Sequence, residues 1–311
     1  MSLKEWIRFC VLGLIWGTSF MWIKIAVTEV SPLVLVAFRT LFGAASLLVI
    51  FLVTGNRDFR WKVMRPWLGI FAVVALVNIA IPFVVISWSE QFIPSGIASI
   101  LNSCVPLFTM LVAPLFLRDD PWSLPKFLGL VIGFVVVVII FLPELGGGLN
   151  KNLLGMLGML LASLSYGLAG IYTRRKAQGL APQMQSFLQL SLASLMVWTV
   201  TLLFDRPLEL PQQPLTWLAL LWLGILGSGI AYILFFSLLH SIGPTRATTV
   251  TYIPPLVGTL LGVIFLDEKI TWLAILGGLL VIAGLAVVNL KQLPRLKLRN
   301  QDVVTEEESL K

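Results

Sequence analysis

Residues 11–26 read VLGLIWGTSFMWIKIA, an apolar stretch interrupted at its middle by a bulky ring, a glycine and two hydroxyls. With its flanks the stretch is long enough to cross a hydrocarbon core about 30 Å thick, because an α-helix rises about 1.5 Å per residue. The ring and glycine, Trp16 and Gly17, return 150 residues later as Tyr166 and Gly167. This stretch therefore predicts both a membrane helix and an internal repeat.

The composition extends the membrane prediction to nearly the whole chain. Of the 311 residues, 58% are hydrophobic and 12% are charged, against about 45–50% and about 25% in soluble domains. The apolar runs are continuous, which favours helices over the alternating strands of a membrane barrel. We predict an all-α integral membrane protein with ten transmembrane helices, near residues 6–27, 33–54, 66–88, 94–117, 124–143, 153–173, 184–204, 215–238, 244–266 and 271–290.

Basic residues are unequally distributed between the loops on the two sides of the membrane. Lys and Arg gather in cytoplasmic loops, so their distribution predicts orientation. With a cytoplasmic N-terminus, the outer segments hold only Lys24, Lys151, Arg206 and Lys269. We expect both termini to be cytoplasmic, the first helix to be a retained anchor and residues 291–311 to be a disordered tail. The net charge of +7 then reflects topology and not a nucleic-acid partner.

The repeat extends beyond the first helix of each half. A shift of 150 residues also aligns Lys24 with Arg174 and Pro94 with Pro244. After a slip of one residue, it aligns Pro106 with Pro255 and Asp119 with Glu268. Each half, 1–150 and 151–290, has five predicted helices. Because five is odd, the second half must enter the membrane from the opposite side. Two inverted five-helix repeats are an architecture of secondary transporters, which bind their solutes between the repeats.

Several stretches resemble a known family. They are WGTSF in the first helix, FRTLFGAASLLV in the second, IASILNSCVPLFTMLVAPLFL in the fourth, and the block from Gly243 to Val288. Together, over about residues 8–290, they resemble the drug/metabolite transporter superfamily, in its ten-helix EamA-like branch. The resemblance implies two five-helix repeats in the cell membrane and the transport of small metabolites, often the efflux of amino acids.

Arg39 is the most informative single residue. It lies about seven residues into the second helix, roughly 10 Å from the membrane boundary, where a charge costs up to about 2.5–3.5 kcal/mol on insertion scales. Its side chain either extends to the boundary or faces a cavity, where it could bind a substrate carboxylate by paired hydrogen bonds. Gln189 occupies the matching position of the second half. A cavity between the halves would then be charged on one side.

Other polar and aromatic residues could line the same path. Ser95, Ser99, Asn102 and Ser103 share one face of the fourth helix, and the ninth helix carries a similar stripe. Either stripe could instead form hydrogen bonds between helices. The predicted substrate-binding residues are Trp16, Ser19, Arg39, Asn78, Trp88, Asn102, Tyr166, Gln189, Tyr232, Thr249 and Tyr252.

Charged residues near the helix ends have two interpretations. Glu90 and His240 align at the repeat shift and are either interfacial loop residues or a titratable gate, because histidine changes charge near neutral pH. Asp267, Glu268 and Lys269 are interpreted as a solvated helix end. Glycine pairs such as Gly13 and Gly17 favour close helix packing, with homodimer contacts as an alternative.

We therefore predict a secondary transporter that exports a small organic solute, such as an amino acid or related metabolite, by alternating access. Protons are a candidate coupling ion. The sequence has one histidine and lacks both a phosphate-binding glycine loop and deep acidic pairs, so we expect no metal, cofactor or enzymatic activity. A membrane-embedded enzyme, and a channel or structural membrane partner, are the alternatives.

Overall fold

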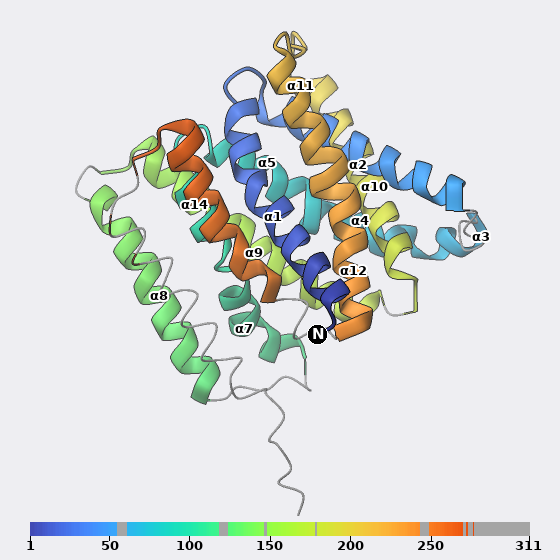
Figure 1. Cartoon of the computed structure of the whole chain (residues 1–311), viewed down its shortest axis with the longest axis horizontal. Coiled ribbons are helices and arrows are strands. Elements are labelled where there is room, and N and C mark those ends of the chain that lie inside the picture. Colours follow the sequence, from blue (N-terminus) through green and yellow to red (C-terminus); the bar gives the residue numbers. More distant parts are fainter. Residues whose placement is uncertain are drawn as a thin grey trace, which may run out of the picture.

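The structure is a computed structural model that describes residues 1–54, 61–117, 124–145, 148–177, 179–242 and 249–269, together with Trp272 and Leu276. All regular elements in this part of the chain are helices (Figure 1). In these residues, eight helical spans, some made of several consecutive elements, are long and apolar enough to cross a membrane, and Val250–Leu266 adds a shorter apolar helix. The all-α membrane prediction is confirmed, while most of the predicted tenth segment and the predicted tail lie outside the described residues.

The predicted segments within the described part coincide with helices to within a few residues. The first half contains α1 (Leu3–Ala26), α2 (Pro32–Thr54), α3 (Trp61–Met64), η1 (Arg65–Trp67), α4 (Leu68–Ala75), η2 (Leu76–Ala80), α5 (Ile81–Ser89), α6 (Ser95–Asn102), α7 (Val105–Phe116) and α8 (Leu124–Leu145). The second half contains α9 (Lys151–Lys176), α10 (Pro182–Phe204), α11 (Pro214–Leu221), η3 (Trp222–Ile230), α12 (Ala231–Ile242), η4 (Thr249–Tyr252) and α14 (Ile253–Leu266).

Three of the spans are interrupted inside the membrane region. The fourth span breaks between α6 and α7, just before Pro106, because proline lacks an N–H and its ring clashes with a carbonyl one turn earlier. The third and eighth spans contain the π-helical segments η2 and η3. Shifted by 150 residues, η2 (76–80) becomes 226–230 and falls inside η3. Such π segments are rare and frequently mark functional sites.

Contacts between the two halves come in matched pairs. Helix α2 of the first half packs against η3 of the second half. Its counterpart α10 of the second half packs against α4 and η2 of the first half. Likewise α1 packs against α12 and α14, and its counterpart α9 packs against α5 and α7. The interface between the halves therefore has an approximate two-fold relationship in its helix contacts.

The directions of α1 and α9 can be read at Ile93. The Lys24 ammonium near the end of α1 donates a hydrogen bond to the Ile93 carbonyl at 2.9 Å, and Gly155 near the start of α9 lies against the Ile93 side chain. Hence α1 ends where α9 begins. We call this the distal end of the bundle, at the top of Figure 1, and the opposite end, where the chain begins, the N-terminal end.

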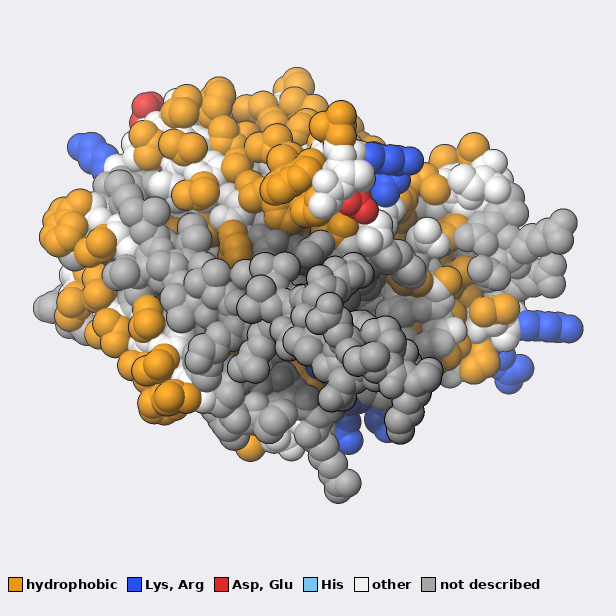
Figure 2. Space-filling view, turned by 60° about the horizontal axis from the view of Figure 1, so that its bottom comes forward, with side chains coloured by type: hydrophobic (Ala, Val, Ile, Leu, Met, Phe, Trp, Pro, Cys, Tyr) orange, Lys and Arg blue, Asp and Glu red, His pale blue; other side chains and the backbone are white. Residues whose placement is uncertain are grey.

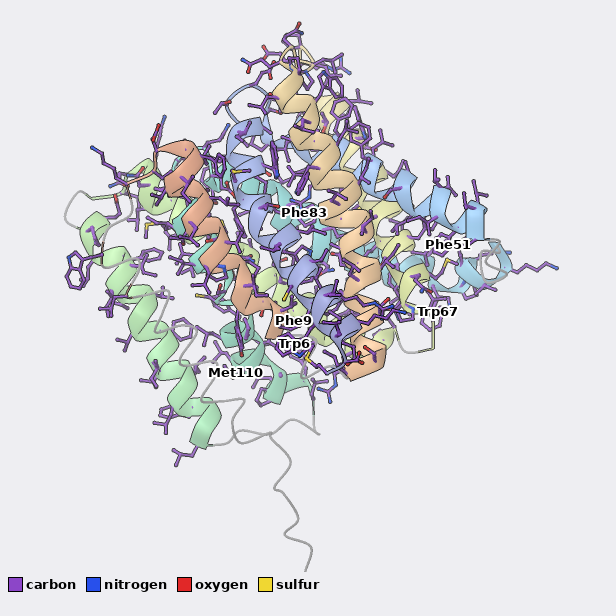
Figure 3. All side chains as sticks on the ribbon, in the orientation of Figure 1. Trp6, Phe9, Phe51, Trp67, Phe83 and Met110 are labelled. Atoms are coloured by element: carbon purple, nitrogen blue, oxygen red, sulfur yellow. The ribbon has the colours of Figure 1, made fainter. Side chains whose placement is uncertain are left out.

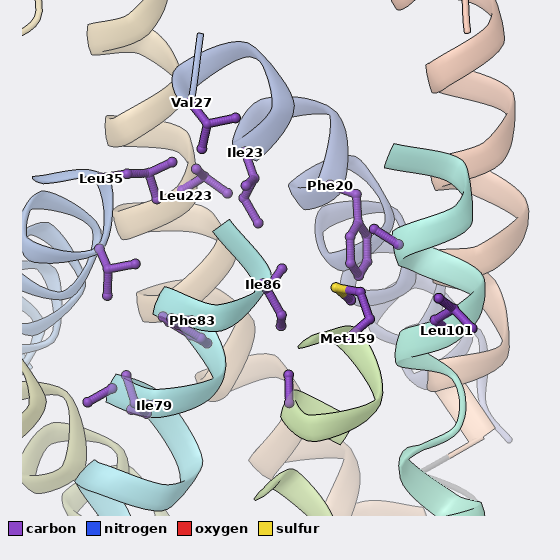
Figure 4. Close-up of a cluster of buried hydrophobic side chains, with 14 of the residues drawn as sticks. Phe20, Ile23, Val27, Leu35, Ile79, Phe83, Ile86, Leu101, Met159 and Leu223 are labelled. Carbon is purple, nitrogen blue, oxygen red and sulfur yellow. The ribbon is translucent and has the colours of Figure 1, made fainter. Parts of the chain in front are cut away.

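A continuous hydrophobic core runs through both halves, and a second apolar region covers the outside. Figure 4 shows the part of the core that we call the apolar layer, comprising Phe20, Ile23, Ile86, Leu101 and Met159. Hydrophobic side chains also cover much of the described surface in Figure 2, and Val53, for example, is 81% exposed. An apolar exterior of this kind is suited to a lipid environment.

Candidate functional site

Arg39 lies inside the bundle and does not extend to the membrane boundary. It is 6% exposed, its Nε donates to the Ser228 Oγ at 3.2 Å, and its guanidinium carbon lies 3.8 Å from the ring centroid of Phe83, a cation–π contact. Electrostatic interactions also link it to Tyr166 and Tyr232. We call these five residues the Arg39 cluster; Figure 3 labels Phe83 in the interior, away from Trp6 and Phe9 at the N-terminal end.

A second polar pair occupies the matching positions of the other half. The Asn78 Nδ2 in η2 donates to the Gln189 Oε1 in α10 at 2.8 Å. Arg39 plus 150 is Gln189, and Asn78 plus 150 is Ser228. Each pair thus joins the second helix of one half to a π segment of the other half. The predicted correspondence of Arg39 and Gln189 has a structural basis, and Ser228 completes it.

The two pairs differ in charge. Among the described residues, the acid that interacts electrostatically with Arg39 is Glu90, whose carboxylate oxygens accept no hydrogen bond. Within the described part, therefore, no carboxylate is hydrogen-bonded to the Arg39 guanidinium. An uncompensated buried charge costs several kcal/mol. The described contacts of the Arg39 guanidinium are a hydroxyl and an aromatic ring.

The interruption in the first helix serves close packing. A side chain on Gly17 would meet Val257 of α14, and one on Gly167 would meet Thr109 of α7. Trp16 packs at 5.6 Å from the ring of Phe235. Trp16 belongs to a small apolar cluster separate from the core that Tyr166 contacts, so the structure does not bring these two rings together.

Several other predicted residues lie outside the Arg39 cluster. The Ser19 hydroxyl donates to the Ile15 carbonyl at 3.1 Å in its own helix and borders Gly227 of η3. Tyr252 packs against the large core, and the Asn102 Oδ1 is buried without a hydrogen-bond partner in the described part. The side chains of Thr249 and His240 lie outside the described residues.

Trp88 lies on a different face of α5 from Phe83. It is 37% exposed and lines an open pocket of about 300 Å³ at the distal end. The other lining residues are Ser31, Pro32, Leu33, Val84, Val85 and Asp205. The structure therefore separates Trp88 from the Arg39 cluster, contrary to the prediction that both line one path.

The polar face of the fourth helix is used for packing against the second half. Side chains on Gly258 and Gly262 of α14 would meet Ser99 and Ser95 of α6, respectively, at less than 3.0 Å. The Ser99 hydroxyl donates to the Gly96 carbonyl within its own helix. Ser95 and Ser99 therefore lie at a contact between helices, the second of the two interpretations of this stripe.

In the segment interpreted as a solvated helix end, Asp267 and Lys269 are exposed, but that interpretation is wrong for Glu268. Its carboxylate accepts from the Ser95 N–H at 2.6 Å, the Gly96 N–H at 3.2 Å and the Ser95 hydroxyl at 3.0 Å. These donors lie at the N-terminus of α6, where unpaired N–H groups and the helix dipole favour an anion. Glu268 therefore fastens the second half to the first at the distal end.

Glu90 and Lys24 complete what we call the distal cluster, together with Ser95, Gly96 and Glu268. The Lys24 ammonium donates to the Glu90 carbonyl at 2.5 Å in addition to that of Ile93. Glu90 is 0% exposed, and both of its carboxylate oxygens lack hydrogen-bond partners in the described part. The structure thus places Glu90 in the interior, unlike an interfacial loop residue.

Glu29 forms a second contact between the halves at the distal end. Its carboxylate accepts from the N–H groups of Gln212 and Gln213, which precede α11. The nearby Thr216 hydroxyl and these two N–H groups stabilise the ionised form and lower the pKa of Glu29. An acid of the first half caps a helix of the second, just as Glu268 does in the reverse direction.

Sequence reasoning missed the roles of Ser228, Lys24, Glu29 and Glu268. The repeat shift could have identified Ser228, because it aligns with Asn78. The other three make contacts with backbone groups distant in the chain, for which the sequence has no local signal.

Comparisons with known proteins agree with this architecture. A family model described as the EamA-like transporter family matches residues 5–142 and again residues 153–290, which supports two repeats. The uncharacterized inner membrane transporter YedA of Escherichia coli is 28% identical, with 89% of this chain and 88% of its own covered. The uncharacterized transporter YoaV of Bacillus subtilis is 24% identical, with 88% and 92% covered. These names indicate a transporter and not an enzyme.

A solved crystal structure has the same fold. It matches 93% of this chain and 98% of its own with a TM-score of 0.66 at 19% identity.

Proposed function

The chain belongs to the EamA-like transporter family, and on that premise we propose that it is a secondary transporter that exports a small carboxylate-bearing solute by alternating access. The observation that carries this proposal is Arg39, a buried guanidinium between the halves with no hydrogen-bonded carboxylate in the described part. A solute carboxylate would supply that partner through charge-assisted hydrogen bonds. An amino acid or related metabolite has the required group.

Two inverted five-helix repeats, ten helices in all, support alternating access as the mechanism. The opposite directions of α1 and α9 agree with inversion, and the matched contacts between the halves agree with a two-fold axis between them. In such transporters the solute binds near the midplane at the repeat interface. The Arg39–Ser228 and Asn78–Gln189 pairs lie across that interface. We assign the solute to the space between them.

Orientation follows from the basic residues. The described Lys and Arg at the N-terminal end include Arg174 and Arg175 at the end of α9, and the distal end carries Lys24 and Lys151. Their unequal distribution along the whole sequence favours a cytoplasmic N-terminal end and an external distal end. The resemblance to exporters then suggests movement toward the distal end, with protons as the candidate coupling ion.

The test begins with the solute itself. Untargeted metabolite measurements on cells that express or lack the protein identify a candidate, and its movement into proteoliposomes is then measured. We expect relocation without chemical change, and an altered solute would indicate an enzyme instead. Arg39→Ala should reduce transport of an anionic or zwitterionic solute, and full activity in a folded Arg39→Ala variant would remove Arg39 from the site.

A further inference from the structure

Glu90 is the buried acid that solute binding at Arg39 does not use. It follows directly after α5, is 0% exposed, and has no hydrogen-bond partner for either carboxylate oxygen in the described part. An ionised carboxylate in such a place loses its hydration and gains no hydrogen bond, which disfavours the charged form. The surroundings therefore favour the neutral, protonated form of Glu90.

Charged groups of three neighbouring segments interact electrostatically with Glu90. They are Lys24 of α1, Arg39 of α2 and Glu268 beyond α14. The Lys24 ammonium is occupied by two backbone carbonyls, and Lys151 of α9 lies over the Phe92 ring at 5.7 Å. None of these cations makes a hydrogen bond to the Glu90 carboxylate in the described part.

The two acids of the distal cluster have opposite environments. Glu268 accepts three hydrogen bonds at a helix N-terminus, which stabilise a negative charge. Glu90 accepts none and has the Glu268 charge nearby. When two interacting acids differ in this way, the one with donors ionises and the other retains its proton. The distal cluster therefore holds one carboxylate with three donors, Glu268, and one without a donor in the described part, Glu90.

The position of Glu90 connects it to opening of the distal end. Phe83, Ile86 and Glu90 follow one another at helical spacing on one face of the third span. Ile86, which Figure 4 shows beside Phe83, belongs to the apolar layer and lies between Phe83 and Glu90 along that face. Separation of α6 from α14 would break the contacts of Glu268 and admit water to the distal cluster.

We propose that Glu90 is a proton-binding site of a distal gate, protonated while Glu268 caps α6 and deprotonated when the halves separate there. This inference rests on the alternating-access function proposed above. Because the closed state binds the additional proton, lowering the pH favours closure and raising the pH favours opening. One linked proton changes the ratio of closed to open molecules by at most about tenfold per pH unit.

Glu29 provides an internal contrast. It also joins the halves at the distal end, but hydrogen-bond donors hold its pKa below the usual value. Glu29 therefore stays ionised above that lowered pKa, and its contact would be lost only at lower pH. Glu90, whose carboxylate accepts no hydrogen bond in the described part, lies in the opposite environment.

The experiment measures gate opening directly and uses no solute. Cys10 and Cys104 are replaced by alanine, and spin labels are placed at Gln91→Cys, exposed beyond α5, and Phe265→Cys, 67% exposed on α14. Distances between the labels in lipid nanodiscs from pH 5 to pH 8 then report the closed and open populations. We expect the closed population to rise as the pH falls, by up to about tenfold per unit.

The variants separate proton binding from structure. Glu90→Gln and Glu90→Ala should each remove the pH response to within about twofold over that range, Glu90→Asp should retain it, and the exposed-residue control Glu209→Gln should not alter it. A wild-type protein without a pH response, or a Glu90→Gln variant that responds as the wild type does, would overturn the inference. Neither outcome depends on solute transport, so failure here is distinguishable from failure of the proposed function.

Discussion

The Arg39–Ser228 and Asn78–Gln189 pairs occupy matching positions of the two halves, yet one is charged and the other is neutral. Both join a second helix to a π segment of the opposite half, at 3.2 Å and 2.8 Å respectively. The repeat preserved where the polar groups lie, while the chemistry of the two sides diverged. A solute bound between them would meet a cation on one side and an amide pair on the other, which would orient it.

The largest expected effect on transport comes from removing the difference in charge between the two pairs. Arg39→Gln gives both second helices the same residue, and transport of a carboxylate solute should fall about ten- to hundredfold, because hydrogen bonds to charged groups contribute about 1.5–3 kcal/mol. Initial rates in proteoliposomes measure this. Gln189→Asn, which retains an amide on the other side, is the matched control and should have a much smaller effect.

The glycines of the first and sixth spans test the packing side of the comparison. A Cβ on Gly17 would lie 2.5 Å from the Val257 Cβ, whereas one on Gly167 would lie 3.1 Å from the Thr109 Oγ1. Gly17→Ala should therefore destabilise the protein more than Gly167→Ala, by about 1–3 kcal/mol for the overpacked site. Thermal unfolding of the two purified variants measures this difference in stability. Equal melting temperatures would contradict the closer packing at Gly17.

The hydrogen-bond partners in the π segments should have smaller effects. Ser228→Ala removes the acceptor that orients Arg39, and Asn78→Ala removes the donor to Gln189. Neither substitution removes the charge of Arg39, so transport should fall less than in Arg39→Gln, by about two- to tenfold. The Ser228 variant should selectively affect carboxylate solutes. If both variants affected charged and uncharged analogues alike, the assigned asymmetry would be wrong.

Trp88→Ala should have the smallest effect. Trp88 lines the open distal pocket and packs against Phe92 at 5.2 Å, apart from the Arg39 cluster. Transport should remain within about twofold of the wild type, in the range expected of a substitution away from the site. A loss comparable to that of Arg39→Gln would place the solute path through the distal pocket instead.

Periodicity, charge and the repeat were sufficient to predict the helical membrane class and most helix positions. They also identified Arg39 and Gln189 as counterparts, because helix positions and repeat positions both depend on spacing along the chain. The contacts of Glu268 could not be predicted in this way. It binds backbone N–H groups of α6, and any sequence at that helix start would supply such donors.

The position of Trp88 shows a second reason why some predicted positions differ from the structure. The sequence places it on the same span as Asn78 and Phe83, but η2 and Pro82 interrupt that span. A π segment changes the residues that share a face, so helical phase cannot be carried across it.

The most direct test of the charged side of the site is selectivity between a carboxylate solute and its uncharged amide. Their initial transport rates would be compared in proteoliposomes containing the wild type or Arg39→Gln. We expect the wild type to prefer the carboxylate by about tenfold or more, and the variant to transport both at similar rates. An unchanged preference in a folded Arg39→Gln variant would contradict the assignment of Arg39 as the anion-binding side of the site.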